Sequence, residues 1–173
     1  MTGRTVDLDE LRAGRCHDRL AAVATDLFAA ATDESADWCT VIIVNGVACD
    51  AAASYALRCF LAADGRRPKP HLGNAQTRKL REVLRARKTV NLKPKSQRAF
   101  WETLTGDRLV RWPDWIRYVR TVDRRNAVLH TGTLPSGRHP ARADAVEALE
   151  VTQSLHAHLA RVMGDDPLVA HLA

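Results

Sequence analysis

The segment 125–130 carries two residue types that are suited to cleaving RNA without a metal ion. It reads Arg125-Asn126-Ala127-Val128-Leu129-His130. Imidazole exchanges protons near neutral pH, so His130 suits a general base or acid at a ribose 2′-hydroxyl. A guanidinium fork matches phosphate oxygens, so Arg125 suits the charge that builds on the phosphate in transit. We therefore expect a catalytic set of Arg125, Asn126 and His130, with Asn126 orienting the other two and no cofactor or metal required.

The helix that must position this segment is expected to span 113–130. At about 100° per residue its apolar residues share one stripe, formed by Trp115, Val119, Val122 and Leu129. Asn126 falls inside that stripe, and Arg125 and His130 lie on its two flanks. Arg124 is expected to face solvent. A polar side chain within an apolar stripe needs a hydrogen bond, so Asn126 and its neighbours should face a ligand, a partner chain or a capping carbonyl.

Arg125 and His130 do not point the same way on a straight helix. Five residues separate them by about 140° of rotation and about 7.5 Å of rise. One phosphate can therefore contact both only if His130 sits at a frayed helix end or if two protomers share the site. A simpler alternative is that both cations occupy the last turn because they interact favourably with the carboxyl end of the helix dipole.

The segment resembles the motif of the HEPN family of small all-helical proteins. That motif has an Arg, a polar residue such as Asn directly after it, and a His beyond about four to six intervening residues. Here Asn126 is in place and four residues separate Arg125 from His130. A glycine-containing turn and one last amphipathic helix follow, as in the family. The resemblance covers most of the chain loosely, and only the motif is specific.

The resemblance implies a HEPN-like bundle of about five to six helices and a metal-independent endoribonuclease, as in a toxin or an antiviral defence effector. His130 would be the general base or acid, Arg125 would stabilise the phosphate, and the products would end in a 2′,3′-cyclic phosphate and a 5′-hydroxyl. Family motif helices pair across a dimer, so the implied partners are RNA, a second copy of the chain through the motif helix, and an antitoxin or regulatory protein. Members controlled by adenylylation often carry Tyr two positions after the His, where this chain has Gly132, so that control is not expected.

Other features admit more than one interpretation. A non-catalytic HEPN-type module could use the same groove to bind nucleotide, RNA or protein and to dimerise. Three tryptophans near the motif helix are expected to pack in the core or at a dimer interface rather than to stack on bases: Trp101, Trp112 and Trp115. Asn45 and Asp50 either line the site from across the core or make local contacts, Asn45 with a backbone group and Asp50 with Ser54 and Arg58 at helical spacing.

Positive charge is concentrated in the segment 64–98. It holds 12 Lys and Arg against two acidic residues, a net charge of +10, whereas the whole chain carries only +6 and the remainder is therefore acidic. Clustered cations neutralise phosphates and release counterions, which predicts an RNA-binding insertion. The residues expected to contact RNA are Arg78, Lys79, Arg81, Arg85 and Lys88. The alternative is a solvated helix face.

The element pattern predicts one all-α domain over 1–173. Expected helices are 7–31, 36–63, 74–89, 98–105, 113–130 and 140–163. Left-handed caps are expected at glycines that are followed by a proline three residues later: Gly65, Gly132 and Gly164. Ser35 is expected to lie at a helix start, and Pro113 and Pro140 in first turns.

Composition narrows the class of protein further. Charged residues interrupt the apolar stretch 38–63, so a buried core helix is expected there rather than a membrane span. The amino terminus is acidic where a secretory signal needs an apolar run, which predicts a cytoplasmic protein without a membrane partner. The four cysteines show no metal-ligand spacing and are expected to be core thiols: Cys16, Cys39, Cys49 and Cys59.

Overall fold

The computed structural model describes residues 16–30, 37–86 and 90–170. It is all-α and 76% helical, with no strand in the described part of the chain. The described elements are α2 (Cys16–Ala30), α3 (Trp38–Asp64), α4 (Asn74–Ala86), α5 (Lys95–Thr105), the 3-10 turn η1 (Leu109–Arg111), α6 (Trp115–Thr131), α7 (Arg142–Gly164) and α8 (Pro167–Ala170). The expected class is confirmed. The helix count exceeds expectation because the short α8 follows the last expected helix.

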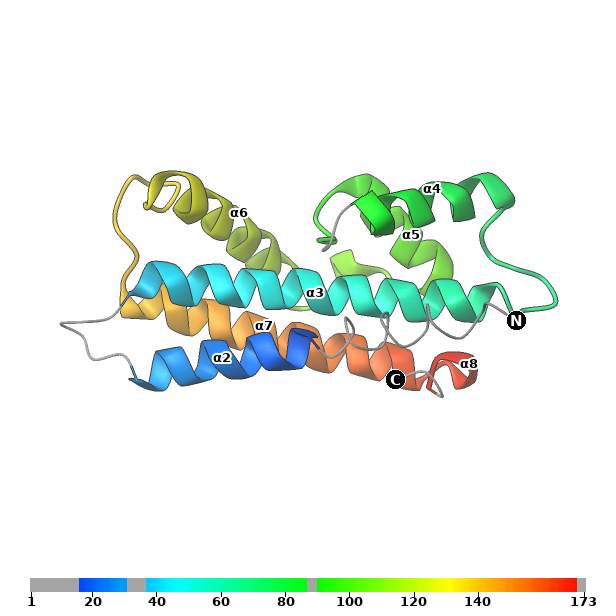
Figure 1. Cartoon of the computed structure of the whole chain (residues 1–173), viewed down its shortest axis with the longest axis horizontal. Helices are drawn as coiled ribbons and strands as arrows, with labels where there is room; N and C mark the ends of the chain where they lie inside the picture. The colour runs from blue at the N-terminus through cyan, green and yellow to red at the C-terminus, as the bar shows by residue number, and fades with distance from the viewer. Residues whose placement is uncertain (1–15, 31–36, 87–89, 171–173) are drawn as a thin grey trace.

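Helix α3 is the central element of the molecule. Figure 1 shows α2 and α7 along one side of α3, and α6, α4 and α5 along the other. The start of α3 is fixed by Asp37, whose carboxylate accepts the backbone N–H of Thr40 at 3.1 Å. Alanines over much of 48–63 favour the helix and let neighbouring helices approach closely. Helices α6 and α4 lie over different halves of α3 (Figure 1), so α3 is the common support for both regions singled out in the sequence.

The apolar character of α3 reflects its place in the bundle. The helix is long and apolar enough to cross a membrane, judged by length and composition alone. In the structure, 72% of its most apolar window is buried. The buried residues lie on all sides of the helix, as is usual for the core helix of a bundle. The expectation of a core helix over 38–63 is met.

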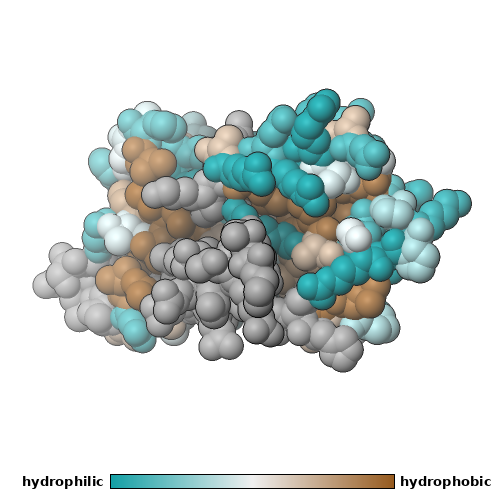
Figure 2. Space-filling model, turned by 45° about the vertical axis from the view of Figure 1, so that its right-hand side comes forward, coloured by the Kyte–Doolittle hydropathy of each residue, from teal (hydrophilic) through white to brown (hydrophobic). Residues whose placement is uncertain are grey.

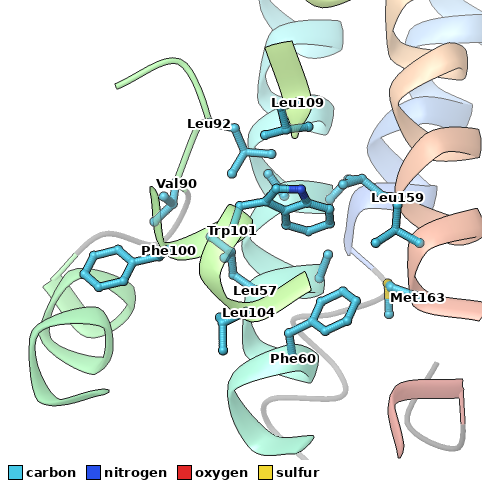
Figure 3. Close-up of a cluster of buried hydrophobic side chains, with 14 of the residues drawn as sticks. Leu57, Phe60, Val90, Leu92, Phe100, Trp101, Leu104, Leu109, Leu159 and Met163 are labelled. Atoms are coloured by element: carbon cyan, nitrogen blue, oxygen red, sulfur yellow. The ribbon is translucent and has the colours of Figure 1, made fainter. Parts of the chain in front are cut away.

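The larger core cluster lies between the second half of α3, α5 and α7 (Figure 3). Trp101 of α5 is fully buried within it, and Phe60 of α3 meets the indole edge-on with ring centroids 5.5 Å apart. Leu109 from η1 and Leu159 from α7 pack around the same indole (Figure 3). Full burial of one such side chain stabilises the fold by roughly 2 kcal/mol. The segment from α5 through η1 is therefore firmly attached to α3 and α7.

The glycine caps are only partly as expected. Gly132 has φ of 70° and ends α6 in the left-handed conformation, as predicted. The predictions for the other two glycines are wrong. Gly65 has φ of −66°, and Gly164 is the last residue of α7, which is capped by Asp165 in the right-handed conformation. Both chain segments leave their helices in the right-handed conformation, so a proline three residues after a glycine does not by itself require a left-handed cap.

Other boundaries differ by a few residues. Helix α5 begins at Lys95, three residues before the expected start, with Pro94 as its N-cap residue. Pro113 and Pro140 stand just before the N-cap residues of α6 and α7 rather than inside the first turns. The expected helical residues 7–15, 31, 36 and 87–89, together with Ser35, lie outside the described residues.

Candidate functional site

The motif helix α6 is rotated about its axis relative to the sequence-based expectation. Its buried residues are Trp115, Tyr118, Thr121, Val122 and Val128. Asn126 is exposed and Leu129 is 54% exposed, so the prediction that Asn126 lies within a buried stripe is wrong. The buried face centres near the direction of Arg125, because two residues not counted as apolar, Tyr118 and Thr121, pack inward.

Arg125 enters the bundle and meets a carboxylate from α3. Its Nη2 donates to Oδ2 of Asp50 at 2.6 Å, and the two side chains are 13% and 5% exposed. Such a charge-assisted hydrogen bond is about twice as strong as a neutral one. Of the two interpretations of Asp50, the contact across the core is therefore present, while Ser54 bonds the backbone carbonyl of Asp50 at 2.8 Å. Asn45 likewise donates to a backbone group, the carbonyl of Val41, at 2.9 Å.

Close packing of α3 against α6 depends on Gly46. A Cβ placed on Gly46 would lie 2.6 Å from Cγ and 2.9 Å from Cβ of Arg125. Both distances are below an ordinary carbon contact of about 3.5 Å. The aliphatic part of Arg125 thus occupies the space that a side chain at position 46 would fill. Gly46 and Asp50 are one helical turn apart, so one face of α3 supplies both the space and the counter-charge.

The polar groups around this pair are incompletely satisfied. Asn45 Oδ1, Asp50 Oδ1 and Arg125 Nε are buried without a hydrogen-bond partner among the described residues. Burial raises the pKa of Asp50, and the Arg125 guanidinium acts against that rise. Burial, and then the charge of Asp50, holds the pKa of Tyr118 well above its usual value. The interior beneath the motif is therefore polar and charged, and it contains buried donor and acceptor atoms that have no hydrogen-bond partner among the described residues.

His130 and Asn126 point away from this interior. Both are exposed, and their side chains make no hydrogen bond or ion pair within the described part of the chain. The end of α6 is held by Cys39 of α3, whose Sγ donates to the carbonyl of Gly132 at 3.6 Å. Within a single chain, Arg125 and His130 therefore point in different directions, as the helical geometry predicts. The three expected catalytic residues do not come together in one chain.

Arg124 is not turned to solvent as expected. Its side chain is 19% exposed and forms ion pairs with Glu147 and, at 3.7 Å, with Asp144 of α7. Two more α6 arginines meet α7 carboxylates in the same series, Arg117 with Glu150 at 2.5 Å and Arg120 with Glu147 at 3.4 Å. We call this set the α6–α7 ion ladder. Sequence periodicity missed it because each pair joins residues 20 or more positions apart.

The basic residues of α4 form an exposed face. Arg78, Lys79, Arg81 and Arg85 are exposed, whereas Leu80 and Leu84 are buried against the bundle; Lys88 lies outside the described residues. Figure 2, which brings the α4 end of the molecule toward the viewer, shows hydrophilic side chains along the upper edge. This arrangement suits either RNA contact or a solvated helix face.

The basic face of α4 and the motif end of α6 lie far apart. Arg58 of α3 donates to the carbonyl of Leu84 in α4 at 2.7 Å, while Cys39 of α3 contacts the end of α6. These anchor points are 19 residues apart on α3, or about 28 Å along the helix axis. An RNA that contacts both regions must therefore be several nucleotides long.

The tryptophans are packing residues in this chain. Trp101, Trp112 and Trp115 are 0%, 8% and 7% exposed. None of them presents a free ring face for a base, so the expected core role of the three residues is met within the chain. Cys49 and Cys59 are likewise buried, and Cys39 is partly buried. Cys16 lies in α2, and its side chain is outside the description.

Sequence reasoning missed a second polar cluster, in which His158 of α7 bonds Asp107 at 2.9 Å. The sequence gives no sign of this pair, because the two residues are 51 positions apart and only the folded chain brings them together. Among the described residues no group of three His, Cys, Asp or Glu side chains is placed to hold a metal ion. Comparison of the chain with family models, curated proteins and solved structures finds no match.

Proposed function

We propose that this chain is a metal-independent endoribonuclease of HEPN type that acts as a homodimer through the exposed face of α6. The observation that carries the proposal is the placement of His130 and Asn126, which are exposed in the last turns of a rigidly held helix without partners in the described chain. Leu129, next to His130, is 54% exposed, and Ile116, in the first turn of the same helix, is 64% exposed. Large apolar side chains around free polar groups are typical of a binding surface.

The reaction follows from the side chains that a dimer would bring together. His130 of one protomer removes the proton from a ribose 2′-hydroxyl, and the resulting oxygen attacks the adjacent phosphorus. The bond from phosphorus to the 5′-oxygen breaks, and His130 of the partner subunit protonates the leaving oxygen. The products are a 2′,3′-cyclic phosphate and a 5′-hydroxyl, and no water or metal is consumed. Asn126 lies about 40° and 6 Å before His130 on the helix, close enough to orient the same phosphate.

Arg125 serves this reaction from the interior. Its guanidinium is held by Asp50 and seated in the space left by Gly46, with Nε still unpaired. We assign it to positioning the carboxyl end of α6. A role as an effector that cleaves cellular RNA, with a regulatory partner protein, would follow from such an activity.

One observation favours a second candidate, a non-catalytic helical module that binds RNA, nucleotide or protein through the same face. The guanidinium of the motif is already paired with a carboxylate, so it is not free to bind a phosphate in the present arrangement. A binding module needs no free arginine. The two candidates differ in one outcome, because both bind at α6 and only the nuclease breaks the RNA chain.

The test is incubation of the purified protein with total RNA in the presence of EDTA. His130→Ala should reduce cleavage about 100-fold or more, because general acid–base groups contribute at least that much. His139→Ala is the matched control, since His139 is also exposed, lies just beyond the same helix and has no side-chain partner among the described residues. Intact RNA with wild type, or cleavage that survives His130→Ala, would contradict the proposal.

The dimer is tested separately by light scattering after size exclusion. Wild type should have twice the chain mass, and Leu129→Glu should convert it to a monomer by placing a charge in the interface. Leu168→Glu is the control, because Leu168 of α8 is also exposed, at 38%, but lies on another element. A wild-type monomer that still cleaves RNA would refute the shared site.

A further inference from the structure

A second site lies at the opposite end of α6 from the motif. A cleft of about 780 Å³ opens between the segment 106–113 and α7. Three arginines line it: Arg108, just before η1, Arg111, in η1, and Arg161, in α7. From the N-cap residue of α6 to His130 the helix rises about 24 Å, so this cleft is separate from the motif.

Two of these arginines have no counter-charge. Arg108 and Arg111 are exposed, and their side chains form no hydrogen bond or ion pair with the described residues. Arg161 is 58% exposed and forms an ion pair with the carboxylate of Asp165 at 3.2 Å, a surface pair that solvent screens strongly. Three guanidiniums that converge on one cleft repel one another unless an anion joins them. Exposed arginines that make no internal contacts are free to turn toward such an anion.

The floor of the cleft is rigid and its acidic group is already engaged. Asp107 Oδ2 accepts the indole N–H of Trp101 at 2.9 Å and lies 2.9 Å from Nε2 of His158. The His158 ring stacks on Trp112 with centroids 5.3 Å apart, and its Nδ1 lies 3.4 Å from a terminal nitrogen of Arg161. Both ring nitrogens are thus in use, so His158 is a positioning residue for Arg161 and Asp107.

The charge of the lining selects the ligand. Within the lining, three arginines face the single carboxylate of Asp107, an excess of two positive charges, and Asp165, outside the lining, offsets part of this excess through its pair with Arg161. Guanidinium groups bind phosphate oxygens in pairs of parallel hydrogen bonds, and a terminal phosphate carries about two negative charges at neutral pH. A phosphodiester inside an RNA chain carries only one. The size of the cleft also lies within the range of small-molecule sites, about 300–1,000 Å³.

We propose that this cleft binds the terminal phosphate of a phosphate ester, with Arg108, Arg111 and Arg161 around the phosphate and the Asp107–His158 pair as the fixed floor. The proposal does not depend on the ribonuclease activity. The same chemistry is offered by a free nucleotide and by the 5′-phosphorylated end of an RNA. The two sources differ in whether the rest of the ligand is a single nucleoside or a chain that leaves the cleft.

The experiment measures binding by titration calorimetry with His130→Ala protein, which keeps any RNA probe intact. The probes are pyrophosphate, ADP, and a short oligoribonucleotide with either a 5′-phosphate or a 5′-hydroxyl. Arg108→Ala and Arg111→Ala should each weaken binding of the phosphorylated probes about tenfold or more, as expected for loss of a charge-assisted pair. Both residues are exposed and unpaired, so these variants keep the fold.

The control is Arg78→Ala, which removes the same charge from an exposed arginine on α4. Support for the proposal is saturable binding that the two cleft variants lose and Arg78→Ala keeps. If ADP binds in this way the source is a free nucleotide, and if only the 5′-phosphorylated oligonucleotide does, the source is an RNA end. The proposal is overturned if no phosphorylated probe binds, if the 5′-hydroxyl oligonucleotide binds equally well, or if all three variants lose binding alike.

Discussion

Replacement of Gly46 by Ala tests the packing that holds the motif helix. The new Cβ would lie 2.9 Å from the Cβ of Arg125, an atom that no side-chain rotation can move, and 2.6 Å from its Cγ. Relief of these contacts requires α6 to move away by roughly 0.5–1 Å. Such a movement also stretches the 2.6 Å bond between Arg125 and Asp50.

Three effects determine the magnitude for Gly46→Ala. Helix propensity alone favours Ala over Gly by about 1 kcal/mol in the middle of a helix. Overpacking opposes it by about 1–3 kcal/mol. Complete loss of the Arg125–Asp50 pair would add about 3–5 kcal/mol, because a buried carboxylate would lose its cation. With the pair weakened rather than lost, we expect a net destabilisation of about 2–4 kcal/mol, dominated by overpacking and by the ion pair.

Urea denaturation followed by circular dichroism measures this difference. Gly164→Ala is the matched control, because Gly164 also lies in a helix but a Cβ there would meet nothing within 4 Å. It should leave stability unchanged or raise it by up to about 1 kcal/mol. Combining Gly46→Ala with Arg125→Ala should give less than the sum of the two effects by more than about 1 kcal/mol. A Gly46→Ala protein as stable as wild type would refute the reasoning.

Three further predictions concern buried groups. Tyr118→Phe removes the oxygen that accepts the N–H of Leu92 at 2.8 Å, and the orphaned buried donor should lower the free energy of unfolding by about 1–3 kcal/mol in urea titrations; no change would mean that this N–H has another acceptor. Burial acts to raise the pKa of Asp144, but bonds from Arg138 and a backbone N–H lower it below 3.8 overall. The ionised carboxylate therefore stabilises the fold above pH 3.8, and this contribution is lost as the pH falls through the lowered pKa. The difference in free energy of unfolding between wild type and Asp144→Asn should shrink in acid. A difference that is the same at about pH 7 and pH 3 would contradict this. Burial raises the pKa of Cys49 to about 12, so at pH 8 it should react with thiol reagents only as fast as the protein unfolds, as peptide mapping of alkylated protein would reveal; rapid labelling of the native state would disprove it.

The helical class and several helix positions could be predicted from the sequence because they depend on local patterns. The left-handed end of α6 at Gly132 follows from glycine's freedom at positive φ. The orientation of α6 could not be predicted, because it depends on the pairing of Arg125 with Asp50, 75 residues earlier in the chain. A rule that counts only apolar residues placed Asn126 inside, whereas a buried ion pair and an inward Tyr118 turn it outward.

The candidate site was predictable in its residue types and not in its arrangement. His130 follows from the chemistry of imidazole and from a motif that six residues define. The contribution of Gly46 could not be recognised, because a glycine inside an alanine-rich helix gives no sign of which side chain fills the space beside it. The arginine cleft was also hidden, since it joins the segment 106–113 to α7 and neither segment is distinctive alone.

The α6–α7 ion ladder has a consequence for how the motif is presented. Positions 117, 120 and 124 of α6 meet 150, 147 and 144 of α7 in reverse order, as antiparallel helices require. Sliding α6 by one turn, about 5.4 Å, would put every arginine beside the wrong partner. The ladder thus helps to fix both the position of α6 along its axis and its rotation about that axis. Its outer pairs are exposed to solvent, so added salt would weaken them, while the buried Arg125–Asp50 pair would continue to hold α6.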